Sequence, residues 1–233
     1  MPTLLIATHN AHKLREIGAI LGPEFQYLDL NHFPGAPAVV EDAGTFAGNA
    51  TKKALQVAEW LCADSSSELR VHGADKFVLA DDSGLEVDAL GGAPGVHSAR
   101  FASIEGSGVR SDQSNNEKLL RLMQDVPDEK RTARFRCVIA VTPWIQTQTR
   151  GPNRSSVCFA NELELQTELF DGICEGRIGR SPCGQGGFGY DPLFIPSGFE
   201  ITFAELDEAA KNQLSHRAQA LAKMRQKLLR GSM

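Results

Sequence analysis

The chain has 233 residues, of which 42% are hydrophobic and 23% are charged, a composition typical of a globular protein with a full core. No apolar run approaches the roughly 20 residues that a membrane-spanning helix needs. The net charge of −5 argues against a broad basic surface for nucleic acid. We therefore expect no membrane or nucleic-acid partner, and a single domain over 1–233 or two closely joined lobes.

The cysteines point to a reducing compartment. They are five in number, widely separated, and include no CxxC pair, which indicates neither a disulfide framework nor a zinc site. The N-terminus has only a short apolar stretch, without the basic and small-residue flanks of a secretion signal. We expect a cytoplasmic protein.

The first half of the chain predicts strand–turn–helix units. An apolar strand at 3–7 precedes a helix in which Leu14, Ile17 and Leu21 share one face. A polar turn at 42–45 leads into a second amphipathic helix over 49–61.

The middle and end of the chain predict strands followed by a closing helix. Residues 77–80 form a wholly apolar run, as in an interior strand, and 132–142 alternate as a long strand does. Further strands are expected at 157–165 and 167–178, and an amphipathic helix over 214–229. Together these elements predict an α/β fold with a mixed β-sheet and flanking helices.

Two pairs of carboxylates are candidates for a metal site. Asp81 and Asp82 follow the apolar run at 77–80, where Ser83 and Gly84 are expected to turn the chain. Strand ends of open α/β sheets bind ligands, and carboxylate oxygens are what Mg²⁺ prefers. A pair of aspartates alone more often caps a turn, but a second acidic pair at 41–42 favours a cation.

The turn after the first strand, ATHNAHK, is a candidate phosphate site. Free N–H groups at a helix start attract phosphate, and Lys13 would add a positive charge there. A simple Asn10 helix cap with an exposed Lys13 explains the same pattern equally well.

A glycine-rich loop at 181–192 matches GxGxxG, but Pro182 and Pro192 flank it, so no helix starts there and dinucleotide binding is rejected. The loop could present Phe188 and Tyr190 for stacking on a base, although one aromatic ring packed in the core remains the alternative, above all for Tyr190. His216 and Arg217 open the final helix and could contact a base edge or a phosphate, although Lys211 and Arg217 could equally belong to a solvated face, which leaves His216 as the unusual member.

These motifs, in this order, resemble the inosine triphosphate pyrophosphatase family over nearly the whole chain, from Leu5 to about Leu221. The densest matches are ATHNAHKLREI, EDAGTFAGNATKKA, ADDSGLEVDALGGAPGVHSARFA, GGFGYDPLF and KNQLSHRAQAL. The resemblance implies an elongated mixed sheet with two lobes around a central cleft, a homodimer, Mg²⁺ dependence, and hydrolysis of ITP, dITP and XTP to the monophosphate and pyrophosphate.

The resemblance also implies a role for individual residues. Asp82 would be the general base and a metal ligand, with Glu41 as a second ligand. The residues expected to bind the substrate are Thr8, His9, Asn10, Ala11, His12, Lys13, Asn49, Lys53, Ser83, Phe188, Gly189, Tyr190, Asp191, Lys211, His216 and Arg217.

The sequence departs from the family pattern at His9, where a small residue or Asn is common, and at His97, where Tyr is. The segments near 62–76 and 143–156 are longer than typical. Two other functions remain open: a hydrolase for modified pyrimidine triphosphates, and a non-catalytic nucleotide sensor. The sensor has no need of three carboxylates, and this disfavours it.

Overall fold

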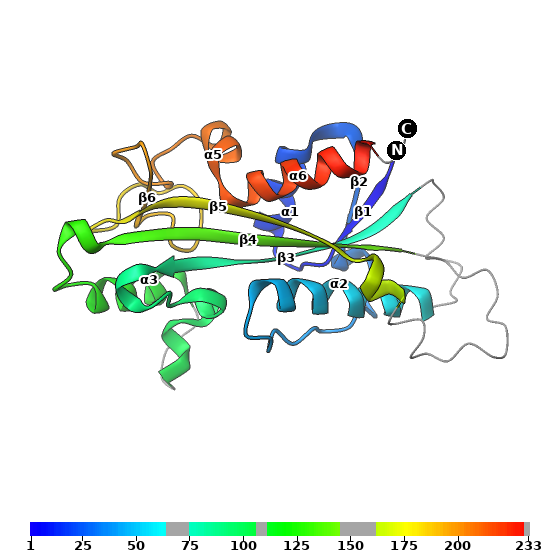
Figure 1. Cartoon of the computed structure of the whole chain (residues 1–233), viewed down its shortest axis with the longest axis horizontal. Coiled ribbons are helices and arrows are strands. Elements are labelled where there is room, and N and C mark those ends of the chain that lie inside the picture. The colour runs from blue at the N-terminus through cyan, green and yellow to red at the C-terminus, as the bar shows by residue number, and fades with distance from the viewer. Residues whose placement is uncertain (64–74, 106–110, 145–161, 231–233) are drawn as a thin grey trace. The chain divides into compact units, whose positions relative to one another are not determined.

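A computed structural model describes residues 1–63, 75–105, 111–144 and 162–230 (Figure 1). Most of the two segments expected to be long, 64–74 and 145–161, lies outside the described residues. The chain divides into two compact units: residues 1–82, 138–170 and 221–233 form the first, and residues 83–137 and 171–220 form the second. In the described ranges no helix is long and apolar enough to cross a membrane.

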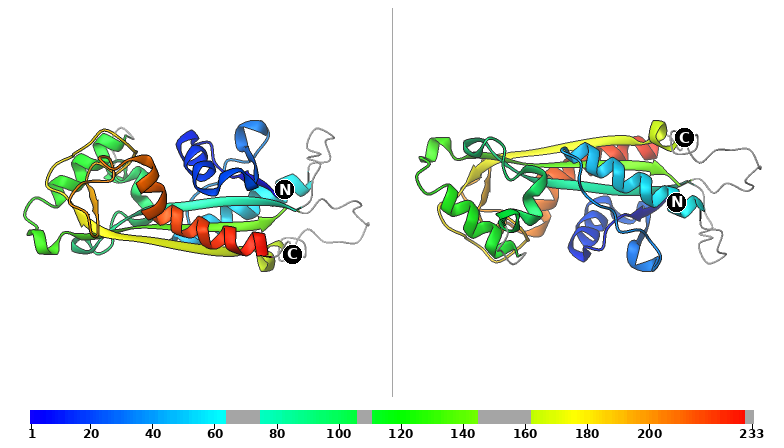
Figure 2. Two further views of the ribbon diagram at one scale, coloured as in Figure 1. Left: turned by 90° about the horizontal axis from the view of Figure 1, so that it is seen from above. Right: turned by 90° about the horizontal axis from the view of Figure 1, so that it is seen from below.

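The first unit contains a doubly wound arrangement around β1 (Thr3–Ile6). β1 pairs in parallel with β2 (Gln26–Asp29) on one side and with the start of β3 (Lys76–Val87) on the other. The connecting helices α1 (Ala11–Leu21) and α2 (Phe46–Ala63) lie on opposite faces of these strands (Figures 1 and 2). Ligands of such sheets bind at the carboxyl ends of the strands where the winding changes direction, here between β1 and β3.

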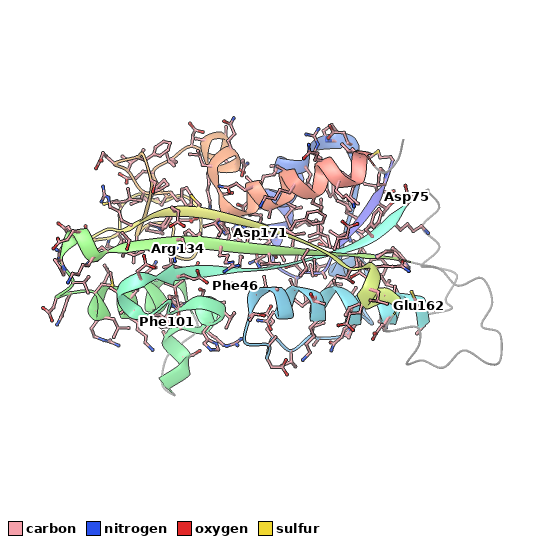
Figure 3. All side chains as sticks on the ribbon, viewed as in Figure 1. Phe46, Asp75, Phe101, Arg134, Glu162 and Asp171 are labelled. Atoms are coloured by element: carbon pink, nitrogen blue, oxygen red, sulfur yellow. The ribbon has the colours of Figure 1, made fainter. Side chains whose placement is uncertain are left out.

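Both predicted helices of this unit form because their apolar residues repeat at helical spacing. In α1 the buried residues include Ile17 and Leu21, and α2 buries Ala50, Ala54 and Val57. Figure 3 shows Phe46 at the start of α2. The predicted strand at 3–7 and the two predicted helices are therefore confirmed, whereas β2 had no prediction.

The second unit consists of the rest of β3, most of β5, parts of β4 and α6, and the elements between them. The sheet order is β2-β1-β3-β4-β5-β6, and β5 pairs antiparallel with β6, so the sheet is mixed as predicted. The bounds are α3 (Asp112–Leu122), β4 (Thr132–Pro143), β5 (Glu168–Ile178), β6 (Phe194–Pro196), α5 (Glu208–Leu214) and α6 (His216–Arg230). Short 3₁₀ turns lie at Gly22–Glu24, Leu30–His32, Asp88–Leu90, Gly95–Arg100, Ala102–Glu105 and Asp128–Lys130.

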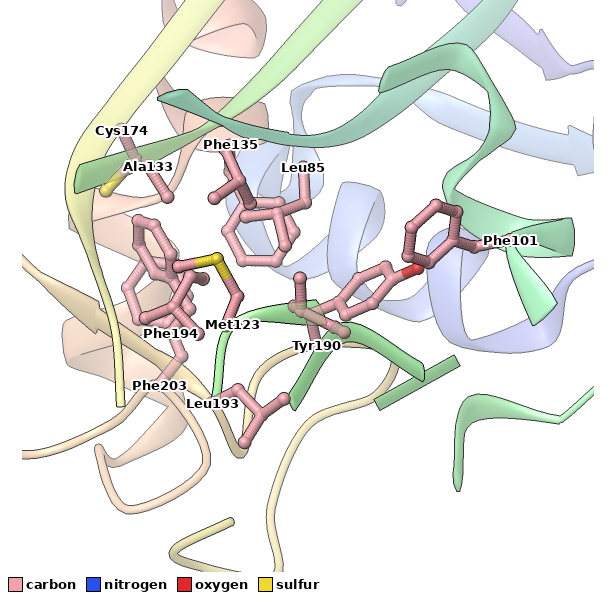
Figure 4. Packing of buried hydrophobic residues seen from close by; sticks show 13 residues of the cluster. Leu85, Phe101, Met123, Ala133, Phe135, Cys174, Tyr190, Leu193, Phe194 and Phe203 are labelled. Atoms are coloured by element: carbon pink, nitrogen blue, oxygen red, sulfur yellow. The ribbon is translucent and has the colours of Figure 1, made fainter. Parts of the chain in front are cut away.

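Aromatic side chains form the centre of the second unit's core (Figure 4). The ring of Phe135 lies 4.7 Å from that of Phe194 and 6.0 Å from that of Phe203, measured between centroids. Leu85 and Val87, at the end of β3, are fully buried in the same cluster. This core holds β3, β4 and β6 together within the unit.

Two sequence-based predictions were wrong. The chain does not turn at Ser83 and Gly84, because β3 continues to Val87, where burial of the side chain and pairing with β4 outweigh the local turn preference. Residues 162–165 of the strand predicted at 157–165 belong to a short helix over 162–166, and 157–161 lie outside the described residues. Figure 3 marks Glu162 in this helix. Its Glu, Leu and Gln side chains favour a helix, and Leu163 is buried while Leu165 is exposed.

Candidate active site

The carboxylates of Glu41 and Asp82 and the backbone carbonyl of Asp81 lie around the ammonium of Lys53 in the first unit, and we call these three acidic residues the acidic cluster. Lys53 Nζ donates to Glu41 Oε1 at 2.8 Å and to the Asp81 carbonyl at 2.5 Å, and it lies 3.9 Å from Asp82 Oδ1. Burial alone lowers the pKa of Lys53, but the acidic cluster outweighs it and leaves the pKa above its ordinary value. Lys53 therefore carries a positive charge at this site near neutral pH.

Asp82 is buried and held by α2. Asn49, one helical turn before Lys53, donates from Nδ2 to Asp82 Oδ2 at 3.0 Å, and its own Oδ1 accepts from the Ala43 N–H at 2.9 Å. Burial raises the pKa of Asp82 above its ordinary value, against the opposing effects of Lys53 and Asn49. A carboxylate of raised pKa at a fixed position has the properties that a general base needs near neutral pH.

Asp81 points to the start of α1. Its carboxylate accepts from Lys13 Nζ at 2.9 Å, and its side chain is only 2% exposed. The structure thus pairs Asp81 with a lysine, a role that the sequence left open.

The segment from Thr8 to Lys13 begins α1 as a capped helix. Asn10 Oδ1 accepts from the backbone N–H groups of His12 and Lys13 at 2.9 and 3.3 Å, and Thr8 Oγ1 accepts from the Asn10 N–H at 3.0 Å. The side chains of His9, Asn10, Ala11 and His12 are exposed. The capping interpretation of Asn10 is therefore correct, and Lys13 points to Asp81.

The side chains of Glu41 and Asp42 bind different lysines. Glu41 binds Lys53 within the acidic cluster, whereas exposed Asp42 binds Lys52 at 2.5 Å. Glu41 is therefore the member of this pair that lies at the site. In the described part of the chain, no group of three or more His, Cys, Asp or Glu side chains is arranged to hold a metal ion.

The second unit carries the remaining predicted residues, with Phe188 at their centre. Lys211 Nζ lies 5.0 Å from the centroid of the Phe188 ring, and Arg217 Cζ lies 5.9 Å from it. Asp191 accepts from the Phe188 N–H at 2.8 Å and from Lys211 Nζ at 2.6 Å through the same oxygen. One carboxylate therefore fixes both the loop and the lysine beside its aromatic ring.

α6 supplies two buried side chains at its first turn. Arg217 donates to Ser83 Oγ at 2.9 Å, and Ser83 is the residue that follows Asp82 in β3. The His216 ring stacks on Phe135, with centroids 4.8 Å apart and planes inclined by 12°. A solvated face is thus the wrong interpretation of Lys211 and Arg217, which are 9% and 1% exposed, and His216 is buried as well.

Tyr190 is a core residue. It is 3% exposed, and its hydroxyl donates to the Ser98 carbonyl at 2.9 Å. Burial raises the pKa of its hydroxyl. Its ring therefore packs inside the second unit, which was the alternative interpretation, and Phe188 is the partly exposed aromatic ring of the loop.

Two residues that contact this loop were missed by the sequence analysis. Asp112 and Asn116 of α3 both bond to Gly189. A signal was present, because Asn is a weak helix former that seldom lies inside a helix without a partner.

Comparison with known proteins places nearly the whole chain in one family. The profile of the Ham1 family matches residues 4–227. A dITP/XTP pyrophosphatase of Desulforamulus reducens is 44% identical over 221 residues, which is 94% of this chain and 92% of that protein. One of Geobacter sulfurreducens is 44% identical over 229 residues, covering 98% and 97%.

Solved structures agree with the sequence comparison. A HAM1 protein from Coxiella burnetii matches with a TM-score of 0.74 and 32% identity, covering 99% of this chain and all of that one. The Staphylococcus aureus Ham1 protein matches with a TM-score of 0.73, at 32% identity and the same coverage. The α/β fold with its mixed sheet is therefore shared along the full length.

Proposed function

The chain belongs to the Ham1 family, and on that premise we propose that it hydrolyses the deaminated purine nucleotides ITP, dITP and XTP to the monophosphate and pyrophosphate. The observation that carries this proposal is the acidic cluster held around Lys53 beside the helix start that carries Lys13. A nucleoside triphosphate carries close to four negative charges, so its binding requires cations at the phosphates.

Asp82 would serve as the general base. It accepts a proton from a water molecule whose oxygen attacks the α-phosphorus, the bond to the β-phosphate bridging oxygen breaks, and pyrophosphate leaves. The raised pKa of Asp82 supports this role, because a base whose pKa lies closer to the working pH takes up the proton more readily. Lys13, Lys53 and the N-terminal end of α1, from Thr8 to Lys13, would bind the phosphates.

Glu41 and Asp82 would hold Mg²⁺. Their donor set fits the ion, because Mg²⁺ takes hard oxygen ligands and is commonly bound by one or two carboxylates together with substrate phosphates. Both carboxylates lie around one ammonium, at 2.8 and 3.9 Å from Lys53 Nζ. When bound, the ion would neutralise phosphate charge and lower the pKa of a bound water.

The second unit would select the base. Phe188 offers a partly exposed ring for stacking, Lys211 and Arg217 supply polar groups beside it, and His216 precedes Arg217 at the start of α6. We propose that these groups bond the 6-oxo edge of a deaminated purine, whereas the 6-amino group of ATP leaves buried donors unpaired. Gly189, Asp191 and Ser83 would fix this surface.

Two further features of the family enter the same proposal. We expect the chain to act as a homodimer, and to work in the cytoplasm. The five cysteines are widely separated and include no CxxC pair, which supports a reducing compartment.

The test is pyrophosphate release from ITP, XTP, dITP, ATP, GTP and UTP, with Mg²⁺ and with a chelator. Release confined to the three deaminated purine nucleotides and abolished by chelation is the expected result. Release from UTP alone would favour a pyrimidine hydrolase. Tight binding of ITP without pyrophosphate release would favour a sensor.

A further inference from the structure

Helix α3 holds the peptide groups of Gly189 from both sides. Asp112 Oδ2 accepts from the Gly189 N–H at 2.7 Å, and Asn116 Nδ2 donates to the Gly189 carbonyl at 3.0 Å. Asp112 and Asn116 are one helical turn apart, so one face of α3 presents both partners. No role assigned above uses this helix.

Gly189 is the residue after Phe188, and its conformation decides where that ring points. Its φ is +62°, in the left-handed region that side-chain-bearing residues rarely adopt. The Phe188 N–H is bonded to Asp191. Side chains therefore fix three backbone hydrogen-bonding groups at Phe188 and Gly189, and two of these bonds come from α3.

α3 is itself anchored at its other end. Buried Arg131 donates to the Met123 carbonyl at 2.6 Å, where the helix ends, and to the Gly179 carbonyl at 2.7 Å, where β5 has ended. Its Nε donates to the Ile178 carbonyl at 2.8 Å. A helix fastened to the backbone at both ends is a rigid support for the loop.

We infer that Asp112 and Asn116 are positioning residues that set the orientation of the Phe188 ring and thereby the selectivity for deaminated purines. The inference rests on the proposed function. Stacking and edge recognition require the ring and the polar groups to be held in a fixed relation, and a displacement of about 1 Å can cost about 100-fold in rate.

The test variant is Asn116→Asp, which keeps the shape but replaces the amide donor by a carboxylate oxygen facing the Gly189 carbonyl. We expect kcat/KM for ITP to fall about 10- to 100-fold, mainly through KM, and the ratio of ITP to ATP hydrolysis to fall with it. Asp112→Asn retains an acceptor for the Gly189 N–H and should stay within about threefold of wild type.

The matched control is Asn115→Asp, the same change one residue earlier in α3. Asn115 bonds the backbone of Ala102 and Ala99 instead of the loop. Its variant should alter the unfolding temperature but not the ITP-to-ATP ratio. The inhibition constant of inorganic tripolyphosphate, which has no base, should be unchanged in every variant.

Equal effects of the two Asn variants on KM and selectivity, or an unchanged KM in Asn116→Asp, would overturn the inference. If Asn116→Asp does not fold, Asp112→Ala decides in its place, with an expected loss of about 3- to 10-fold in the same ratio. Wild-type protein that fails to hydrolyse ITP would refute the proposed function. If the wild type is active and Asn116→Asp keeps the wild-type ratio of ITP to ATP hydrolysis, only the inference is refuted.

Discussion

The ammonium of Lys13 lies 2.9 Å from the carboxylate of Asp81, which is 68 residues later in the chain. The contact joins the first turn of α1 to the part of β3 just beyond its pairing with β1. It therefore lies at the point where the winding of the sheet changes direction, which is the usual ligand site of such folds. The same pair contributes to folding and brings a cation to the proposed phosphate site.

Replacement of Lys13 by Met should destabilise the protein by about 3 kcal/mol, because it removes the nearest cation from a buried carboxylate. The double variant Lys13→Met/Asp81→Asn should regain most of that loss without regaining activity. Denaturant unfolding of the four members of this cycle measures the coupling. Strictly additive free energies would show that the pair does not couple.

Replacement of Asp82 by Asn should lower kcat about 100- to 10,000-fold and leave the fold intact. The sign of its effect on stability is set by the pKa of Asp82, which is raised in the folded state. Ionisation of Asp82 then disfavours the fold once pH exceeds its unfolded value, near 4. The Asn variant should be at least as stable as wild type at pH 7, and the difference should shrink as pH falls through the raised folded pKa and vanish below about pH 4. Near-normal turnover would refute the assignment of the base.

Asn49 should control the pH dependence of activity. Its hydrogen bond favours the ionised form of Asp82, so Asn49→Ala should raise the pKa of Asp82 further. The acid limb of the kcat profile should move to higher pH. Lys52→Ala is the control, because Lys52 binds exposed Asp42 on the same helix and should leave that limb in place. Equal shifts in both variants would contradict the role of Asn49.

Local patterns explain which parts of the fold could be predicted. The repeats of α1 and α2 and the alternation of β4 are properties of neighbouring residues, and each element formed where predicted. The prediction ended the strand of β3 too early, because Ser83 and Gly84 favour turns locally. The burial of Leu85 and Val87, which extends the strand, depends on residues distant in sequence.

In the candidate site, too, local patterns could be predicted and contacts between distant residues could not. Motifs identified Lys13, Lys53 and Asp82 one at a time, but their pairing across 28 to 68 residues depends on how β1, β3 and α2 pack. Spacing could not separate Glu41 from Asp42, since consecutive residues in a loop can point to any side. The contact of α3 with Gly189 spans 73 and 77 residues and has no local signature beyond the unusual Asn116.

The backbone of α6 lies against Gly172 of β5. A Cβ at this position would meet the His216 carbonyl oxygen at 2.0 Å and the Ala220 nitrogen at 2.7 Å, both of them backbone atoms. Gly172→Ala should therefore displace the first turns of α6, destabilise the protein by about 1–3 kcal/mol and raise KM for ITP through His216. Unfolding free energy and steady-state kinetics measure the two effects.

Gly18→Ala is the matched control, because a Cβ in that part of α1 meets nothing within 4 Å. Glycine inside a helix costs about 0.5–1 kcal/mol relative to alanine, so this variant should be more stable than wild type by that amount and keep its KM. If Gly172→Ala were as stable as Gly18→Ala and kept the wild-type KM, the close approach of α6 to β5 would not be what holds His216 in place.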